Sequence, residues 1–374
     1  NENIDYRLRH AEFPAAEGVR YLGRPIASLS QLQRVLVVGS NLRKDHPLFA
    51  QRIRQAARMG CAVNAINSEA FDWAMPVANV VVSAASGWTR VLAEVAAAVA
   101  AEKGVGAPVA ATPGTQAQAI AKSLMGGDRK AILLGNGAAH HAGLGSLLAL
   151  ANWIGGQTGA TVGFLGEAAN TVGAQFVNAM PGAGGQNAGQ MLAGGLKAAL
   201  LLNTEPEFDS AAGVTGANAL AQCQMVVTLS PFKANMAISD VLLPIAPFTE
   251  TPGTFVNAEG RVQSFHAVVK PLGETRPAWK VLRVLANLLN LPGFDEDSAQ
   301  AVLAKILSGT PGATSGLPES RLGNATQAAI DLTPVGDAPS VAGIYQLDSI
   351  VRRASSLQMT ADARIAQASE GVPA

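Results

Sequence analysis

The sequence predicts an α/β protein with doubly wound parallel sheets, and three observations support that fold class. Continuous apolar runs of strand length, such as VLVVG at 35–39, are typical of strands that are covered on both faces. The segment 34–66 reads as strand, helix and strand, which makes one βαβ unit. This alternation recurs along the chain, as expected where helices cover both faces of a parallel sheet.

The first βαβ unit sets the pattern for the start of the chain. Asp45 suits the N-cap of a helix, Pro47 suits its first turn, and Gly60 ends it. A strand is then predicted at 77–84 and a helix at 89–104. We therefore expect Rossmann-like βαβ units in this part.

The later chain repeats these elements. Further buried strands are predicted from the runs RKAILLGNG, LKAALLLN, QMVVTLS and SDVLLPIA, with helices at 144–154 and 277–293. The pattern lapses at 108–116, so a domain change is placed there. We expect an irregular lead-in at 1–30, an α/β domain at 31–112, a second α/β domain at 113–300, and a linker and tail at 301–374. Within the last part, 308–342 is rich in Gly, Pro, Ser and Thr and predicts a linker or long loop, while 344–360 predicts a docked segment.

Charge is scarce in this sequence. Charged residues make up 14%, against about 25% in typical domains, so much of the surface is expected to be covered by something else. Between Ala131 and Leu196 the only Asp, Glu, Lys or Arg is Glu167, which fits either a domain interior or a face toward a partner or cofactor. The net charge is zero without a basic run, which argues against nucleic-acid binding. Polar residues interrupt the stretch too often for a membrane span.

Cysteine usage limits the redox chemistry. Cys61 and Cys223 are the only two cysteines, so this chain cannot by itself build a four-thiolate iron–sulfur or zinc site. Nothing indicates a disulfide-stapled secreted protein, and NENIDYRLRH lacks the apolar region of a signal peptide. We expect a cytoplasmic piece of a longer protein.

Two glycine turns follow predicted strands, where open α/β sheets bind ligands. Gly39, Ser40 and Asn41 follow the first, and Gly135 and Asn136 lead to His140 and His141 after another. Either turn could hold a phosphate, but neither is a GxGxxG or a P-loop, so tight turns without a ligand are the alternative. The adjacent histidines should point apart and serve as hydrogen-bonding residues. No nucleophile elbow or HExxH motif is present.

Two other segments need explanation. ETPGTFVNAEGRVQ at 250–263 predicts a hairpin whose turn places Gly260 at positive φ. The hairpin alone does not explain Glu250 and Arg261, which we expect to form a buried or half-buried polar pair, with Glu259 as another partner of Arg261. The glycine-rich stretch 181–195 either lets the backbone approach a ligand or chain closely, or is mobile.

These features together resemble the molybdopterin oxidoreductase superfamily. The resemblance rests on VLVVGSN…HP, ILLGNG…HH and SDVLLP, followed by Glu250, Gly253, Thr254, Asn257, Glu259, Gly260, Arg261 and Gln263. More narrowly, NTEPEFDS, GEAANTVGA, LGETRPAWKVLRVLANLLNLPGFD and YQLDSIVRRASSLQMT resemble the large iron–sulfur subunits of bacterial NADH–quinone oxidoreductase, respiratory complex I. The resemblance covers nearly the whole chain.

The resemblance implies two α/β domains of the formate dehydrogenase/DMSO reductase type, which in the superfamily hold a bis-molybdopterin guanine dinucleotide between them. Positions in the cofactor cleft would be Gly39, Ser40, Asn41, Gly135, Asn136, His140, His141, Glu250, Gly253, Thr254, Asn257 and Arg261. The sequence departs from catalytic members, because RHAEFPAAEGVRYLG holds no Cys or Ser to ligate a metal and 131–196 lacks arginines and aspartates. The resemblance therefore implies a vestigial cleft that has lost its cofactor, without catalytic or metal-binding residues.

For function, the resemblance implies a structural and interaction region in a complex that transfers electrons from NADH to quinone, coupled to proton translocation. Its partners would be the other subunits and an N-terminal iron–sulfur domain that carries the clusters, on the cytoplasmic side of the inner membrane. The alternative is part of a catalytic molybdopterin guanine dinucleotide oxidoreductase, such as a formate dehydrogenase relative. A free dinucleotide-binding dehydrogenase is disfavoured, because no glycine fingerprint is followed by an acidic residue about twenty positions later.

Overall fold

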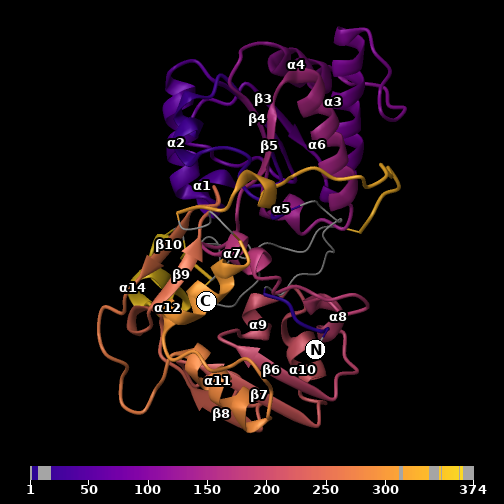
Figure 1. The fold of residues 1–374 in the computed structure, drawn as a ribbon. Coiled ribbons are helices and arrows are strands. Elements are labelled where there is room, and N and C mark those ends of the chain that lie inside the picture. The colour runs from indigo at the N-terminus through magenta and orange to yellow at the C-terminus, as the bar shows by residue number, and fades with distance from the viewer. Residues whose placement is uncertain are drawn as a thin grey trace.

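The computed structural model describes residues 2–6, 18–310, 315–336, 345–346, 348–361 and 363–364. Two α/β parts lie one above the other, with a hairpin and the last described residues between and beside them (Figure 1). The upper part holds a five-stranded sheet and the lower part a three-stranded sheet, and every strand pair in both sheets is parallel. The predicted α/β class with parallel sheets is confirmed.

The five-stranded sheet has the order β3-β2-β1-β4-β5. Its strands are β1 (Arg34–Val38), β2 (Ala62–Asn67), β3 (Asn79–Val82), β4 (Lys130–Leu134) and β5 (Thr161–Phe164). In β1, Leu36 and Val38 face one core cluster, whereas Val35 and Val37 face the other. Because alternate side chains of a strand point to opposite faces, a continuous apolar run fits a strand that is covered on both sides.

Helices cover both faces of this sheet. One face packs on η1 (Ile26–Gln31) and α2 (Pro47–Arg58), and the other on α3 (Trp88–Lys103), α4 (Thr115–Met125) and α6 (Leu144–Thr158). α3 ends where Gly104 adopts a left-handed conformation, as the sequence predicted. Asp45 is not the N-cap of α2. It closes the short helix α1 (Leu42–Asp45), and His46 takes the cap position before Pro47.

Strand pairing places the predicted domain boundary at 112/113 inside the first sheet. β4 and β5 lie beyond that boundary, yet β4 pairs with β1 along its whole length. The lapse in pattern at 108–116 is the connection between α3 and α4, which pack against each other. The change in local pattern marks a helix–helix connection and not a domain boundary. The pairing of β1 with β4, which shows this, leaves no local signal in the sequence.

The three-stranded sheet has the order β6-β7-β8, with β6 (Ala198–Leu202), β7 (Met225–Ser230) and β8 (Val241–Pro244). One face carries an apolar cluster that includes residues of α8 (Ala188–Leu192) and α10 (Gly213–Leu220). On β6 and β7, Leu200, Leu202 and Met225 remain nearly half exposed. The predicted strands are present, but the expectation that they are buried on both faces is wrong for the described residues.

The hairpin is built from β9 (Gly253–Val256) and β10 (Val262–Phe265), which pair antiparallel. Asn257 Oδ1 accepts the backbone N–H groups of Glu259 and Arg261 at 3.1 and 2.9 Å, and Gly260 has φ +87°. The predicted turn is therefore confirmed. The remaining helices include α7 (Thr171–Phe176), α11 (Ala278–Leu288), α12 (Ala299–Ser308), α13 (Ser349–Arg352) and α14 (Ser355–Gln358), with the one-turn segments η2 (Ala85–Gly87), η3 (Phe248–Glu250) and η4 (Glu319–Arg321).

The glycine-rich stretch lies against the first described residues. A Cβ on Gly182 or Gly185 would come within 1.9 or 2.1 Å of atoms of Glu2, so these glycines allow two chain segments to approach closely. The predicted linker is partly packed, because Ile330 and Leu332 contact the first core cluster. Other parts of the predicted lead-in, linker and tail (7–17, 311–314, 337–344 and 365–374) lie outside the described residues.

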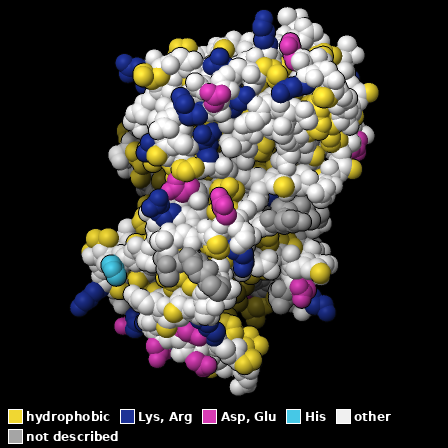
Figure 2. Space-filling view, turned by 45° about the horizontal axis from the view of Figure 1, so that its top comes forward, with side chains coloured by type: hydrophobic (Ala, Val, Ile, Leu, Met, Phe, Trp, Pro, Cys, Tyr) yellow, Lys and Arg dark blue, Asp and Glu magenta, His cyan; other side chains and the backbone are white. Residues whose placement is uncertain are grey.

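Charged side chains of both signs are interspersed with uncharged atoms on the face shown in Figure 2, in places beside one another, with no broad field of one sign. Among the residues that the structure describes, no helix combines the length and apolar character needed to cross a bilayer.

Candidate functional site

The two predicted glycine turns lie side by side at the carboxyl edge of the first sheet. Gly39 follows β1 and Gly135 follows β4, the neighbouring strand. The N–H of Gly135 donates to the Val38 carbonyl, and the N–H of Gly137 donates to the Gly39 carbonyl, both at 2.8 Å. The sheet order therefore brings together two segments that the sequence identified separately.

These glycines are required by contacts within the chain. Gly39 has φ +67°, and a Cβ there would come within 2.5 Å of the Ala138 nitrogen and 2.7 Å of Trp88 Cζ3. A Cβ on Gly135 would come within 2.3 Å of the Ser40 Cβ. The space that glycine keeps free for phosphate in nucleotide-binding turns is filled here by backbone and by Trp88.

A polar cluster surrounds Ser40. Its N–H donates to Asn67 Oδ1 at 2.8 Å, and its hydroxyl donates to Asp45 Oδ2 at 3.1 Å. Asn67 ends β2, and its role was not predicted. Three buried side-chain atoms at this edge make no hydrogen bond of good geometry among the described residues, namely His46 Nε2, Asn67 Nδ2 and Asn136 Oδ1. Asn136 is nevertheless near enough to His46 to favour its protonated ring. Since buried polar atoms normally find partners, this edge fits a water molecule or another small polar ligand.

Burial controls the protonation of Asp45 and His46. It raises the pKa of Asp45 to about 6, although the hydrogen bonds from Ser40 and Asn41 act in the opposite direction. It lowers the pKa of His46 to about 4, against the smaller effects of Glu167 and Asn136, which favour the protonated ring. The His46 ring is therefore neutral at neutral pH.

The adjacent histidines point to different partners. His140 Nε2 lies 2.7 Å from Glu167 Oε2, and both side chains are largely buried. His141 Nδ1 accepts the N–H of Gly143, which leaves its Nε2 to donate to the Ala85 carbonyl at 2.7 Å. The His141 ring also stacks on Trp88, and burial lowers its pKa. His141 thus packs with the turn, whereas His140 and Glu167 line a pocket.

That pocket lies beyond β4 and β5 and is mostly apolar. Its lining includes Arg20, Phe164, His140, Glu167 and Ala258. Ala258 belongs to the turn of the hairpin, so that turn borders the pocket.

None of the predicted residues of the 250–263 element lines this pocket. Thr254 Oγ1 lies 2.9 Å from Ser264 Oγ, and Gly253 lies under the Phe265 ring. Glu250 accepts the N–H of Leu272 at 2.9 Å and does not pair with Arg261. The expected Glu250–Arg261 pair is therefore absent from the described residues, because Glu250 turns toward the segment after β10.

Arg261 pairs with Glu259 instead, at 3.1 Å. Its side chain is 62% exposed, whereas that of Glu259 is 16% exposed. Glu259 also accepts the N–H of Ile26 at 2.6 Å, which ties the hairpin to the segment before β1. In this pair the carboxylate of Glu259 is largely buried, whereas the guanidinium of Arg261 is mostly in solvent.

The side chains near this edge do not fit a thiolate-ligated metal. Cys61 directly precedes β2 and Cys223 lies just before β7, so both are at the amino ends of strands, away from the glycine turns. Burial raises the pKa of Cys61 to about 11, which keeps its thiol protonated. In the described ranges, no three His, Cys, Asp or Glu side chains are grouped to hold a metal ion.

Comparisons with known proteins place the chain in a family. The model of the family "Molybdopterin oxidoreductase" matches residues 1–288, more than half of the 374 residues. The chain belongs to the molybdopterin oxidoreductase family. Its fold is similar to that of acetylene hydratase from Pelobacter acetylenicus, with a TM-score of 0.54 and 13% identity over 76% of this chain and 53% of that one.

Two curated relatives match shorter segments. The "Putative formate dehydrogenase SAB2186c" of Staphylococcus aureus (strain bovine RF122 / ET3-1) is 47% identical over 57 residues, or 15% of this chain and 6% of that protein. The mitochondrial 78 kDa subunit of NADH-ubiquinone oxidoreductase from Candida albicans is 43% identical over 72 residues, or 19% of this chain and 10% of that protein. The matched segments therefore span a small part of either relative.

Proposed function

We propose that this chain is part of the large iron–sulfur subunit of an NADH–quinone oxidoreductase, in which the α/β region serves structure and subunit contact and holds no molybdopterin. The observation that carries the proposal is the filled carboxyl edge of the first sheet. Trp88 and backbone occupy the space beside Gly39, Ser40 and backbone occupy that beside Gly135, and neither cysteine lies there. Electron transfer from NADH to quinone would belong to the parent complex, through clusters outside this chain.

Two further features support the proposal. The 78 kDa subunit of Candida albicans shares a segment with this chain. The half-exposed apolar side chains on β6 and β7 also suit a surface that other subunits cover, since monomeric proteins rarely expose large apolar patches. On this proposal, the protein sits at the cytoplasmic side of the inner membrane without crossing it.

The second candidate is part of a catalytic molybdopterin guanine dinucleotide oxidoreductase related to formate dehydrogenases. The similarity to the Staphylococcus aureus protein favours it, as do the three buried polar atoms near Ser40 that make no hydrogen bond of good geometry. A cofactor could supply partners for them.

Metal analysis separates the two candidates. The chain is purified from a host that makes molybdenum cofactor, beside a working formate dehydrogenase from the same host as the control. We expect molybdenum and tungsten only in the control, and no visible absorption from the chain. Molybdenum or tungsten near one atom per chain would establish the catalytic candidate and refute the proposal.

A further inference from the structure

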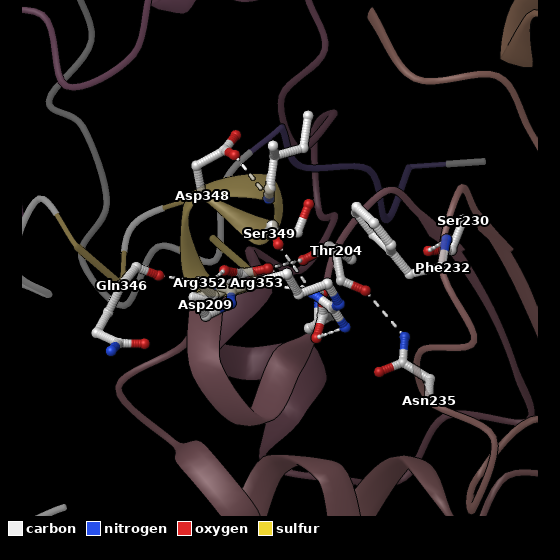
Figure 3. A network of polar contacts seen from close by, with 12 residues as sticks. Thr204, Asp209, Ser230, Phe232, Asn235, Gln346, Asp348, Ser349, Arg352 and Arg353 are labelled. Carbon is white, nitrogen blue, oxygen red and sulfur yellow. Dashed lines mark hydrogen bonds and ion pairs between the residues drawn. The ribbon is translucent and has the colours of Figure 1, made fainter. Parts of the chain in front are cut away.

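Two adjacent arginines near the end of the described chain dock on the second sheet. Arg352 ends α13, and Arg353 follows it. Figure 3 shows Arg352 and Arg353 close to Asp209, which belongs to the segment after β6. Glu205 of the same segment accepts hydrogen bonds from Arg353. The docked pairs are separated by 148 and 143 positions in the sequence, so nothing local brings them together.

Arg353 makes the contact with the most specific geometry. Its Nη1 donates to Glu205 Oε1 at 2.7 Å, and its Nη2 donates to Glu205 Oε2 at 3.0 Å. The guanidinium carbon also lies 4.3 Å from the centre of the Phe232 ring. Such paired hydrogen bonds combined with ring stacking require the planar guanidinium, and a lysine cannot reproduce them.

Arg352 is more deeply buried, with 7% of its side chain exposed. Its Nη1 donates to Asp209 Oδ1 at 2.6 Å, and its guanidinium lies 5.4 Å from the centre of the Phe208 ring. Its Nη2 is 3.5 Å from Glu205 Oε1, which adds a second charge contact. Each arginine therefore donates hydrogen bonds to one carboxylate and lies against one aromatic ring, and Glu205 is close to both arginines.

Glu205 and Asp209, the acidic partners, are held in place by contacts within their own loop. The other oxygen of Asp209 accepts the Glu205 N–H at 2.7 Å and the Thr204 hydroxyl at 3.3 Å. The Phe232 N–H donates to the Ser230 hydroxyl at 3.1 Å. These contacts do not involve the arginines, so the loops after β6 and β7 arrange the partners without them, which lowers the cost of binding.

The site occupies a position where α/β sheets bind ligands. Glu205 and Phe232 follow the carboxyl ends of β6 and β7. The same terminal segment reaches the first sheet, because the Tyr345 ring lies 5.8 Å from Lys44 Nζ in α1. The segment thus connects the carboxyl edges of the two sheets.

We propose that Glu205, Phe208, Asp209 and Phe232 form a binding site for two adjacent arginines, and that Arg352 and Arg353 of this chain occupy it as a detachable strap. With the strap in place, its charges are neutralised at the site. With the strap displaced, two carboxylates remain and repel phosphate, so the free site binds an arginine pair and not a nucleotide. This holds under either candidate function.

The test uses the full chain with Arg352→Ala and Arg353→Ala together. A fluorescent peptide with the sequence of 345–360 is titrated into this variant and into the unchanged chain. We expect binding at least about tenfold tighter to the variant, because the attached segment competes in the unchanged chain at a high effective concentration. Arg276→Ala is the control, since Arg276 pairs with the exposed Glu274 far from this site in the sequence, and it should behave like the unchanged chain.

Two further measurements test specificity. A peptide with lysine at both arginine positions should bind the double variant about tenfold more weakly, and adding Glu205→Gln to that variant should weaken the arginine peptide similarly. Three outcomes would overturn the proposal. They are equal binding of the two peptides to the double variant, equal binding of the arginine peptide to the variant and the unchanged chain, and no binding of either peptide to a folded variant. If circular dichroism shows the double variant unfolded, Arg353→Lys replaces it. Faster tryptic cleavage after residue 353 than in the unchanged chain supports the strap, and an unchanged rate refutes it.

Discussion

The ring of Trp88 lies where a side chain at Gly39 would project, 2.7 Å from the position of an added Cβ. Trp88 begins α3, and its Nε1 donates to the Ser83 carbonyl at 3.0 Å, which fixes the ring in this place. The ring also stacks on His141. One tryptophan thus joins both glycine turns and closes the space between them.

Gly39→Ala should therefore destabilise the fold strongly. Gly60→Ala is a matched control, since Gly60 also has positive φ but no atom within 4 Å of an added Cβ. The control should cost about 1 kcal/mol from backbone strain alone. Gly39→Ala adds a clash with backbone at 2.5 Å and should cost at least about 2 kcal/mol more in urea unfolding. Equal losses would mean that the turns can separate freely.

Asp45 and His46 should make opposite contributions to the pH dependence of stability. The folded Asp45 has a pKa of about 6, whereas the ordinary value is 3.8. Because the folded protein keeps this proton longer than the unfolded chain does, the free energy of unfolding decreases as the pH rises from 3.8 to about 6. In the unfolded chain His46 is protonated below about pH 6.5, whereas the folded ring is protonated only below about pH 4. The free energy of unfolding therefore decreases as the pH falls from 6.5 to about 4. Each shift corresponds to at most about 3 kcal/mol, and the two effects largely cancel between pH 4 and 6.

Single substitutions separate these effects. In Asp45→Asn the free energy of unfolding should increase as the pH rises from 4.5 to 6.5, and in His46→Gln it should decrease over that range. Glu167, which acts on both groups, is unchanged in either variant. Urea unfolding at intervals of half a pH unit measures the slopes. Two variants with profiles parallel to the unchanged chain would contradict the assigned burial effects.

The two members of the Arg261–Glu259 pair should differ in importance. Arg261→Ala should cost less than about 1 kcal/mol, because its side chain is mostly in solvent. Glu259→Ala removes a buried acceptor from the Ile26 N–H and should cost about 1–3 kcal/mol. Thermal and urea unfolding compare them directly. A larger loss for Arg261→Ala would show that the guanidinium holds the hairpin.

The cysteines should react at different rates. Cys61 is buried and its pKa is raised to about 11, while Cys223 is partly exposed and its pKa is raised by burial alone. At pH 8, a thiol reagent should label Cys223 first and Cys61 only after denaturant is added. Peptide mass spectrometry locates the label. Prompt labelling of Cys61 would mean that the edge before β2 opens readily.

The sequence identified the parts of the fold that leave a local signal. Apolar runs revealed the strands, and Gly104 and Gly260 revealed a helix end and a turn, because positive φ selects glycine. Strand order was not predictable, so β4 and β5 were assigned beyond the boundary at 112. The exposed side of Leu200 was missed for a related reason, since an apolar run does not tell whether a second layer covers it.

The candidate site was predictable only in its turns. The segments of Gly39 and Gly135 were found because glycine follows a strand in each case. Asn67 and Trp88 were missed, since an asparagine at a strand end and a tryptophan at a helix start have many ordinary roles. Of the two glutamates expected to pair with Arg261, Glu259 does so and Glu250 does not, because a sequence does not tell which way a loop side chain turns.

The central position of β1 has a consequence for synthesis on the ribosome. β2 and β3 can join β1 as soon as they emerge, but its other edge stays open until β4 has been made, after both α3 and α4. During that interval a strand that is apolar from Val35 to Val38 exposes unpaired backbone groups, the feature by which strands of different chains aggregate. We therefore expect this edge of β1 to be open to aggregation while the helices between β3 and β4 are being translated.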